Sequence, residues 1–459
     1  MSEQPFTPML FPSIDGITNT TNWNYSHIWL HKQPFFLWLM ALSIKLFGST
    51  AFAVRIPSIL LNSFAIFGGY RLGKNLSGNF TGLTLAVLLS TSFIANNLST
   101  GQETTDHNDA IFVSLVLISF WLLSEYWFND KKKTMYCIGI IAGMAVLTKW
   151  LTGLIVFLPW FLLIVQKGIT AQRVKHIITA FIITLLIVLP WQLYCYYQFP
   201  SEYVHEIQLN QLHFSSVVEG HGGDSWYYLK NLRHQYLKIQ FPAVFIVWLG
   251  LLLFFLIKEK DNSRRIFVSI PILAVFLFFS IAQTKMPLFT FMVFFLLYYL
   301  LAFFISELRK SIQQRFSPII TRIILGLVLL FVSFHNLRLQ EFRNIHFPKT
   351  SVEHQYYFNQ NKQQYDQIME IEQLAFSEKS SIFFNTPKHL HPSYTFFTGV
   401  PSFDFIPDEP VIYNLITEGY QPIILFEQEA FNKEEMSQQY TILHKLSNGS
   451  LLTTPVIRE

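Results

Sequence analysis

Side chains that could do chemistry gather in four short stretches of this 459-residue chain. The first is HKQP, which begins at His31 and directly precedes an apolar run. The second is GQETTDHNDAIF at 101–112, and the third is EGHGGDSWYYLKNLRHQY at 219–236. The fourth is TKMP around Lys285, between two further apolar runs. Ionisable groups are costly beside hydrocarbon, so residues in such places are candidates for function.

The residue types in these stretches suggest three kinds of chemistry. Lysine and arginine at a membrane interface suit a lipid-linked phosphate or pyrophosphate. A histidine beside an acid could hold a divalent metal ion or serve as an acid or base. Aromatic side chains such as those of WYY suit a sugar face or an isoprenoid chain. The candidate cations are Lys32, Lys230, Arg233 and Lys285, and the candidate acids and histidines are Asp106, Asp109, His31 and His221.

Each candidate also has an ordinary structural explanation. Lys32 and Lys285 could merely extend toward lipid headgroups. Asp106 and Asp109 could cap a helix and charge its first turn, and His221, between glycines, could be an exposed loop residue. The histidines of HEIQLNQLH lie eight residues apart rather than four, so this stretch is not a zinc-protease motif.

The composition that surrounds these residues is typical of a polytopic membrane protein. Hydrophobic residues make up 51% of the chain and charged residues only 14%, whereas soluble proteins carry about 25% charged residues. We predict an interfacial helix over 35–47 that begins at Pro34, and no disulfide. Ten stretches could cross a bilayer of about 30 Å. They lie near 52–70, 79–98, 110–128, 134–148, 152–166, 177–197, 240–257, 266–283, 287–306 and 318–336.

The distribution of lysine and arginine predicts which end of these stretches faces the cytoplasm. Fifteen lie in the connections after the odd-numbered stretches, and five lie in the other connections. The positive-inside rule therefore puts the first set in the cytoplasm and 1–51, 99–109, 198–239 and 337–459 outside. All four chemical stretches then share the outer side of the membrane.

The outer position of the first fifty residues leads to a further expectation. No signal peptide is visible ahead of this polar and aromatic tail, so nothing in the chain would start its export. We expect a first transmembrane helix in the complete gene product, upstream of Met1. A tail that is translocated without such a helix is the alternative.

The C-terminal part of the chain has a different pattern. Its charge rises, its apolar runs shorten, and helical patterns at 351–377 and 409–419 alternate with strand patterns. The strands are expected at 380–384, 422–427 and 440–446. We predict an all-α polytopic membrane protein with a small C-terminal α/β domain. Its parts are an outer loop with the interfacial helix (1–51), a transmembrane domain (52–336) and the outer α/β domain (337–459).

The run HKQPFFLWLMALSIKLFGSTAFAVRIPS at 31–58 resembles one family of membrane enzymes. It is similar to the polytopic GT-C glycosyltransferases of the protein mannosyltransferase and aminoarabinose transferase group, which use polyprenyl-phosphate sugars. That group has a Lys-Pro-Pro-like motif, then W-x-x-A-L-S-x-K-L-F-G, then Arg-hydrophobic-Pro-Ser. Weaker matches are an acid after threonine near 105–109, a histidine before WYY, and TKMP in place of Ser-Lys-hydrophobic-Pro. The resemblance covers about 27–300.

The resemblance implies an inverting sugar transfer. A carboxylate acts as general base on the acceptor hydroxyl, and a polyprenyl phosphate leaves with its charge stabilised by lysine and arginine. Some members of the group also hold a metal ion, so a divalent ion is the implied cofactor. The corresponding residues here are Lys32 at the phosphate, Lys230 or Arg233 as a second cation, His31 and His221 at the metal, and Asp106 or Asp109 as the second outer-loop acid.

One part of the family pattern is not in this chain. The Asp-Glu pair expected ahead of Lys32 is missing, so we expect the catalytic base on the preceding segment, and the chain as written could be inactive. The implied partners are a polyprenyl-phosphate-linked sugar, membrane lipid and a lipid, glycan or protein acceptor, with no nucleic acid. The implied location is the bacterial inner membrane, with the C-terminal domain on the periplasmic side. Alternatives are a non-catalytic carrier-lipid-binding relative, a surface-polysaccharide polymerase or ligase, and a lipid-linked sugar transporter.

Overall fold

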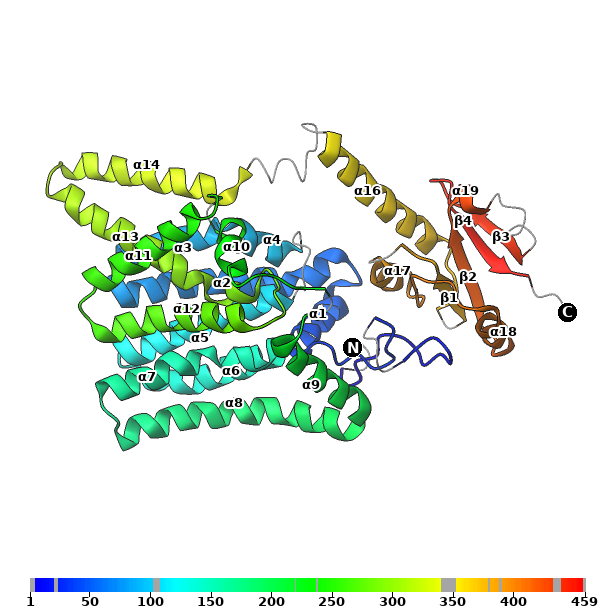
Figure 1. Ribbon diagram of the computed structural model, residues 1–459, viewed down its shortest axis with the longest axis horizontal. Helices are drawn as coiled ribbons and strands as arrows, with labels where there is room; N and C mark the ends of the chain where they lie inside the picture. The colour runs from blue at the N-terminus through cyan, green and yellow to red at the C-terminus, as the bar shows by residue number, and fades with distance from the viewer. Residues whose placement is uncertain are drawn as a thin grey trace.

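The computed structural model of the chain consists of a helical bundle and a small sheet domain (Figure 1). It describes residues 5–19, 24–101, 108–218, 220–236, 238–339, 352–378, 380–387, 390–431 and 439–456.

The bundle contains the helices that the apolar stretches predict. The first is α1 (Pro34–Phe47), and it starts with proline at its first turn, where no hydrogen bond is lost. The others are α2 (Ala51–Ser77), α3 (Asn79–Ser90), α4 (Phe93–Thr100), α5 (Asn108–Phe128), α6 (Thr134–Lys149), η1 (Trp150–Val156), α7 (Phe157–Lys167), α8 (Ala171–Gln198), α9 (Pro200–Ser215), α10 (Tyr227–Gln235), α11 (Ala243–Lys258), α12 (Asn262–Ile281), η2 (Phe289–Val293), α13 (Phe294–Gln313) and α14 (Pro318–Leu337).

Every predicted apolar stretch coincides with helix in this bundle. Within the described residues, seven helical stretches are long and apolar enough to cross a membrane, or eight if the bent pair α3–α4 counts as one span. One of the seven, Thr134–Lys167, folds back on itself at Trp150. A Cβ atom on Gly153 would lie only 2.5 Å from the backbone nitrogen of Val146, so the reversal requires glycine there. The fourth and fifth predicted stretches therefore form a tight helical pair.

The bend between α3 and α4 is held by polar side chains from two other helices. The two helices meet at 53°. The bend frees the carbonyl of Leu88, which accepts a hydrogen bond from the Asn336 side chain on α14 at 2.8 Å. The Tyr298 hydroxyl on α13 donates to the Asn336 carbonyl oxygen at 2.6 Å. The freed backbone group is thus satisfied inside the bundle, as a membrane interior requires.

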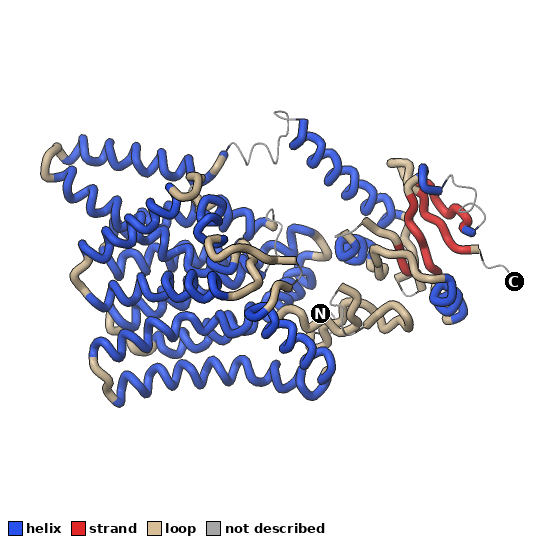
Figure 2. Tube along the Cα trace, in the orientation of Figure 1, coloured by secondary structure: helices blue, strands red, loops and turns tan. Residues whose placement is uncertain are grey.

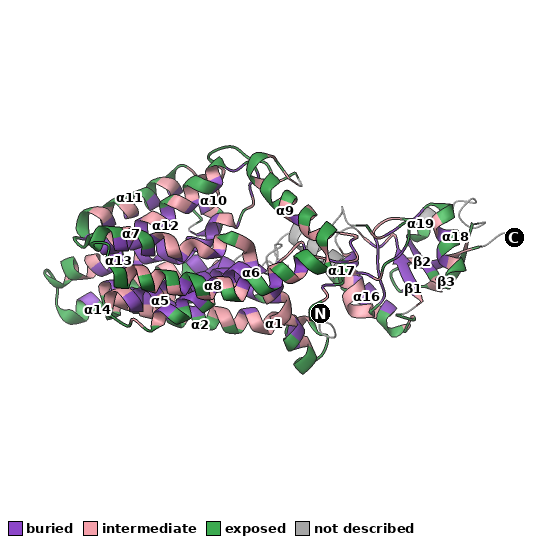
Figure 3. Ribbon diagram, turned by 90° about the horizontal axis from the view of Figure 1, so that it is seen from below, coloured by how far each residue is buried: buried purple, intermediate pink, exposed green. Residues whose placement is uncertain are grey.

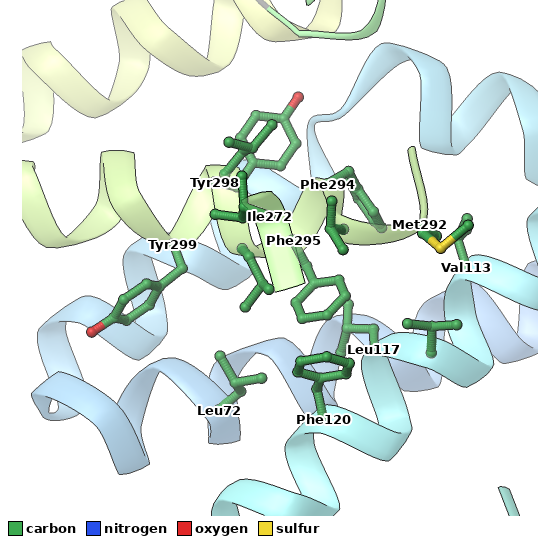
Figure 4. Close-up of a cluster of buried hydrophobic side chains, with 14 of the residues drawn as sticks. Leu72, Val113, Leu117, Phe120, Ile272, Met292, Phe294, Phe295, Tyr298 and Tyr299 are labelled. Atoms are coloured by element: carbon green, nitrogen blue, oxygen red, sulfur yellow. The ribbon is translucent and has the colours of Figure 1, made fainter. Parts of the chain in front are cut away.

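The centre of the bundle is a densely packed apolar core. Figure 3 shows the buried residues concentrated inside the bundle, with exposed residues along its outside. Figure 4 shows side chains from several helices meeting there, among them Phe120 of α5 and Phe295 of α13. Their ring centroids lie 5.2 Å apart with an edge-on geometry, which is the arrangement that aromatic pairs prefer. This core fixes the ends of the helices on which the ionisable residues lie.

The two ends of α5 carry different ion pairs. At one end, Glu125 accepts hydrogen bonds from Arg71 of α2 at 2.5 and 2.9 Å, and it also pairs with Lys131 at 2.8 Å. At the other end, Asp109 pairs with Lys149 of α6. The basic connections therefore gather at one end of the bundle, and the predicted chemical residues that are described lie toward the other end.

The C-terminal domain is a four-stranded mixed sheet with helices. Figure 2 shows the sheet in red, apart from the helical bundle. The strand order is β1-β2-β4-β3, with β1 parallel to β2 and the other pairs antiparallel. The elements are α16 (Val352–Gln373), β1 (Ser381–Phe384), α17 (His391–Thr398), α18 (Glu409–Thr417), β2 (Gln421–Phe426), α19 (Gln428–Phe431), β3 (Tyr440–Lys445) and β4 (Leu451–Pro455).

The predicted fold class is confirmed in both parts of the molecule. The three predicted strands are present, and β4 and α17 were not predicted. The segment 5–30 contributes Phe11, Ile14 and Ile17 to the core on one face of the C-terminal sheet. The predicted boundaries at 51 and 336 therefore separate residues that share one core.

Candidate functional site

The HKQP stretch lies where α1 meets α8 and α9. The imidazole Nδ1 of His31 is 3.3 Å from the carboxylate of Glu206 on α9, and both side chains are largely buried. The Gln192 amide on α8 donates to the Gln33 side-chain oxygen at 2.8 Å. These contacts hold the backbone on both sides of Lys32, whose side chain is half-buried. The start of α1 therefore presents Lys32 from a fixed position.

A second charged group lies at the same end of the bundle. Asp109, in the first turn of α5, is only 5% exposed and accepts a hydrogen bond from the Lys149 ammonium group. The Lys149 nitrogen also lies 5.3 Å from the ring centroid of Phe289 and 5.9 Å from that of Phe112. A buried carboxylate with a partner of opposite charge is stable, whereas one without a partner is not. The pair therefore fixes the ends of α5 and α6 against η2.

A cavity of about 950 Å³ opens beside α10. Among the described residues, Lys230, Arg233 and Arg338 line it together with one carboxylate, that of Asp224. Lys230 donates a hydrogen bond to Asp224, which lowers the pKa of that carboxyl. That pair is neutral, so Arg233 adds positive charge to the described part of the lining. Its apolar lining comes from Phe93, Ile94, Phe241 and Pro287.

Arg338 joins the end of α14 to the end of α10. Its Nη2 atom lies within hydrogen-bonding distance of the carbonyl oxygens of Arg233 (3.2 Å), His234 (2.6 Å) and Tyr236 (2.9 Å). A cation at these last carbonyls is favourable, since the C-terminus of a helix carries partial negative charge. The guanidinium group also lies 5.1 Å from the Phe93 ring centroid. Arg338 thus fixes one wall of the cavity.

Lys285 has a different environment from the one its predicted role requires. Its ammonium group donates to the carbonyls of Phe279 (2.9 Å), Ser280 (2.7 Å) and Ala282, at the end of α12, and the residue is 4% exposed. Burial lowers the pKa of Lys285, and the nearby Asp224 partly offsets this effect. An ammonium group held by three carbonyls is not available to a phosphate, so we leave Lys285 out of the proposed phosphate sites.

The loop with His221 is fastened to the segment that contains Lys285. The backbone nitrogen of Lys285 donates to the His221 carbonyl at 2.7 Å, and the Thr284 hydroxyl donates to the Ser216 carbonyl at 2.9 Å. The partner found for His31 is Glu206, and no contact between the side chains of His31 and His221 is found among the described residues. A metal site shared by the two histidines stays a prediction.

The divalent metal ion stays a prediction. Across the described ranges, no group of three or more His, Cys, Asp and Glu residues could hold a metal ion. His31 and Glu206 supply two donor groups, which is fewer than a stable site needs. The donor set therefore does not fit a metal within these ranges, and no step below involves one.

The remaining predicted residues are divided between two places. Asp106 lies at 102–107, outside the described residues. Lys32, His31 and Asp109 lie at the ends of α1 and α5, whereas Lys230 and Arg233 line the cavity at α10. Figures 1 and 3 both show α1 and α10 apart from each other. The predicted phosphate cations thus lie in two places, Lys32 at the start of α1 and Lys230 with Arg233 at the α10 cavity, and a phosphate site that they share stays a prediction.

Three residues of the site were not singled out from the sequence. Lys149 is one of the five cations in the less basic connections, and its place at the end of an apolar stretch is the same signal as that of Lys285. Glu206 lies in the HEIQLNQLH stretch, and the spacing of the two histidines there excludes a zinc-protease motif. Arg338 follows the last apolar stretch directly and gives no local sequence signal.

Comparisons with known proteins show which chains this one is similar to. The family described as dolichyl-phosphate-mannose-protein mannosyltransferase matches residues 31–194. The undecaprenyl phosphate-alpha-4-amino-4-deoxy-L-arabinose arabinosyl transferase 2 of Pseudomonas fluorescens is 23% identical over 284 residues, which are 58% of this chain. The match covers 49% of that relative, so the chain spans about half the length of the curated relatives it matches.

Solved structures with this fold come from the same class of enzymes. ArnT from Cupriavidus metallidurans bound to undecaprenyl phosphate aligns with a TM-score of 0.68 and 14% identity, over 93% of this chain and 88% of that one. The Archaeoglobus fulgidus oligosaccharyltransferase complex with Zn and sulfate aligns with a TM-score of 0.55 and 12% identity, over 98% and 67%. The predicted resemblance is confirmed: the chain has the fold of GT-C glycosyltransferases of the ArnT-like group.

Proposed function

We propose that this protein is a membrane glycosyltransferase that moves a sugar from a polyprenyl-phosphate donor to an acidic lipid acceptor. One observation carries the proposal. Two groups of cations, at Lys32 and at the α10 cavity, occur at the end of the bundle opposite the basic connections, and the second group lies over an apolar lining. Basic connections favour the cytoplasm, which puts both groups and the C-terminal domain on the outer side of the inner membrane.

The donor is assigned to the group at α1. Lys32 is held at the start of α1 by the neighbouring contacts of His31 and Gln33, so its ammonium group can meet a phosphate without a large loss of side-chain freedom. The words undecaprenyl phosphate appear in the names of the ArnT-like relatives, and this supports a polyprenyl phosphate as the anion. A charge-assisted hydrogen bond to the leaving phosphate would strengthen as its negative charge develops.

The transfer itself is a single displacement. The acceptor hydroxyl gives its proton to a carboxylate, its oxygen bonds to the anomeric carbon, and the bond from that carbon to the phosphate oxygen breaks. The electron pair of that bond leaves with the polyprenyl phosphate. Asp109 is paired with Lys149. This pair holds Lys149 at the end of α6, and the acid roles of Asp106 and Asp109 stay predictions.

The acceptor is assigned to the cavity at α10. The positive charge of Arg233 suits a phosphorylated headgroup, and Phe93, Ile94 and Phe241 suit its hydrocarbon chain. Arg233 donates to the Gln240 side chain at 2.6 Å, which pre-orients the guanidinium group. A cavity with a few fixed polar groups on an apolar lining is typical of a ligand site.

The experiment that tests this function is a transfer assay in detergent with two substrates. The donor is undecaprenyl phosphate-linked 4-amino-4-deoxy-L-arabinose, the acceptor is bacterial lipopolysaccharide, and release of undecaprenyl phosphate is measured. The double variant Lys230→Ala, Arg233→Ala is expected to raise the KM for the acceptor by about tenfold or more, with little change in the donor KM, since it removes charged hydrogen-bond donors from the cavity alone.

A matched control is the double variant Lys258→Ala, Lys260→Ala, which removes two exposed lysines at the opposite end of the bundle. It is expected to behave like the unaltered protein. The proposal is contradicted if the unaltered protein releases no undecaprenyl phosphate, or if the cavity variant changes the donor KM and leaves the acceptor KM as it was.

A further inference from the structure

The N-terminal segment 5–30 and the C-terminal sheet domain share one hydrophobic core. Phe11 and Ile14 are each 1% exposed and Ile17 is 4% exposed, although they belong to a segment without helix or regular strand. They pack among Ile382 and Phe384 of β1, Phe403, and residues of α18 and β2. The rings of Phe11 and Phe403 lie 4.7 Å apart. One face of the sheet is therefore covered by a segment that lies more than three hundred residues earlier in the chain.

A polar contact joins the same two parts. The Tyr25 hydroxyl donates a hydrogen bond to the carboxylate of Asp404. Burial and this neighbouring carboxylate raise the pKa of Tyr25 to about 12, so the hydroxyl keeps its proton and remains a donor. The Tyr25 ring also packs edge-on against Phe405, with centroids 5.2 Å apart. The hydroxyl group and the aromatic ring of Tyr25 thus both contact the C-terminal domain.

The two ends of segment 5–30 are anchored on the membrane bundle. The indole nitrogen of Trp38 on α1 donates to the Pro5 carbonyl at 2.8 Å, and the Phe6 ring packs against Trp38 and Tyr194. Ile28 and Leu30 are buried among residues of α6 and α8. Leu30 directly precedes His31, so this anchor ends where the predicted donor site begins.

A short hairpin connects the contacts with the sheet domain to the contacts with the membrane bundle. The backbone nitrogen of Leu10 donates to the His27 carbonyl at 2.9 Å, and that of Trp29 donates to the Pro8 carbonyl at 2.7 Å. Met9 and Ile28 form an antiparallel bridge. A two-stranded hairpin is at best marginally stable by itself. Phe11, Ile14 and Ile17 of this hairpin are buried against the sheet domain, so the domain stabilises the hairpin that leads into His31 and Lys32.

We propose that the C-terminal domain acts as a positioning element for the donor site, because it holds segment 5–30 and thereby the His31–Lys32 end of that segment. The domain then contributes to phosphate binding without supplying a ligand. Tyr25, Asp404 and Phe11 are positioning residues that act through Lys32. The part that concerns phosphate binding rests on the proposed function, whereas the shared core does not.

The shared core is tested by cutting the chain. A recognition sequence for a site-specific protease is inserted between Arg338 and Val352, and the purified protein is cleaved in detergent. The C-terminal fragment is expected to stay bound to the tagged bundle through segment 5–30. The variant Ile14→Asp is expected to release it, since it places a charge in that core, whereas Ile442→Asp on the exposed side of β3 is expected to retain it. Release from the unaltered protein, or retention by Ile14→Asp, overturns the shared core.

The positioning role is tested by a double-mutant cycle on undecaprenyl phosphate binding. Tyr25→Phe removes the bond to Asp404 and is expected to weaken binding about five- to tenfold. In the Lys32→Ala background the same change is expected to have no further effect, because it acts through Lys32. Tyr413→Phe, on an exposed tyrosine of α18, is the control.

An equal effect of Tyr25→Phe in both backgrounds overturns the positioning role, as does the absence of any effect in the unaltered background. If Lys32→Ala alone leaves binding unchanged, the assigned phosphate contact fails, and the positioning role through Lys32 fails with it. The cleavage experiment still decides separately whether the domain and the segment share one core.

Discussion

Replacing Lys149 with methionine is expected to lower the free energy of unfolding by about 3–5 kcal/mol, because it removes a charged partner of the buried Asp109 carboxylate. Asp109 is 5% exposed, and water cannot easily replace the lost ammonium group. The same change also removes a cation that lies over the Phe289 and Phe112 rings. Denaturant unfolding in detergent micelles, followed by circular dichroism, measures the loss.

Two further variants separate the ion pair from other effects of this substitution. Asp109→Asn combined with Lys149→Met is expected to recover most of the lost stability, because both charges of the ion pair are then removed together. Lys167→Met removes an exposed lysine at the opposite end of the bundle and is expected to change little. The ion pair does not contribute to the stability of the fold if the Lys149→Met variant has the same free energy of unfolding as the Lys167→Met variant.

Replacing Lys32 with alanine is expected to weaken the binding of undecaprenyl phosphate by about ten- to a hundredfold, since a hydrogen bond from a charged donor contributes about 1.5–3 kcal/mol. The helical fold should be kept, because Pro34 and the contacts of Gln33 with Gln192 still define the start of α1. Titration of the purified protein with undecaprenyl phosphate, with intact complexes counted by native mass spectrometry, gives the dissociation constants.

Lys45 on the same helix provides the matched control for this measurement. It is exposed in the last turn of α1, so Lys45→Ala removes a similar charge away from the proposed site. Its dissociation constant is expected to match that of the unaltered protein. Equal affinities for the Lys32→Ala and Lys45→Ala variants would show that Lys32 does not bind the phosphate.

The helices could be predicted from the sequence because their signal is local. A run of apolar residues between polar connections identifies α5 or α8 without knowledge of their neighbours. The strands β1, β2 and β3 were found by the same argument, since each is a short apolar run between turn residues. The strand β4, with the sequence LLTTP, was missed because it has only two apolar residues at its start.

The arrangement of the site could not be predicted because its contacts join distant parts of the chain. Asp109 and Lys149 are forty residues apart, and neither position shows which helix end the other one faces. Lys285 has the sequence context of a phosphate ligand, but its ammonium group caps the end of α12 instead. Arg338 reaches α10 across about a hundred residues. Such contacts depend on how helices pack, which a single sequence does not specify.

The segment at the N-terminus gives a similar lesson. Phe11, Ile14 and Ile17 show no helical or strand periodicity, so the sequence predicts a loop. That prediction is right for the backbone, but it gives no indication that the three side chains enter the core of the sheet domain. Domain boundaries predicted from composition divide the chain into consecutive ranges. Here the core of the sheet domain combines residues from both ends of the chain, so such boundaries divide it.

The central claim is that both groups of cations and the C-terminal domain lie on the outer side of the membrane. Single cysteines at Ser225 and Thr417 test that side, and one at Lys133 tests the other; all three positions are exposed, and Cys137 is first replaced by serine. In right-side-out membrane vesicles, a membrane-impermeant maleimide is expected to label the cysteines at 225 and 417 and to spare the one at 133. Labelling at 133, or protection at 225 and 417 until the membrane is permeabilised, would contradict the proposed arrangement.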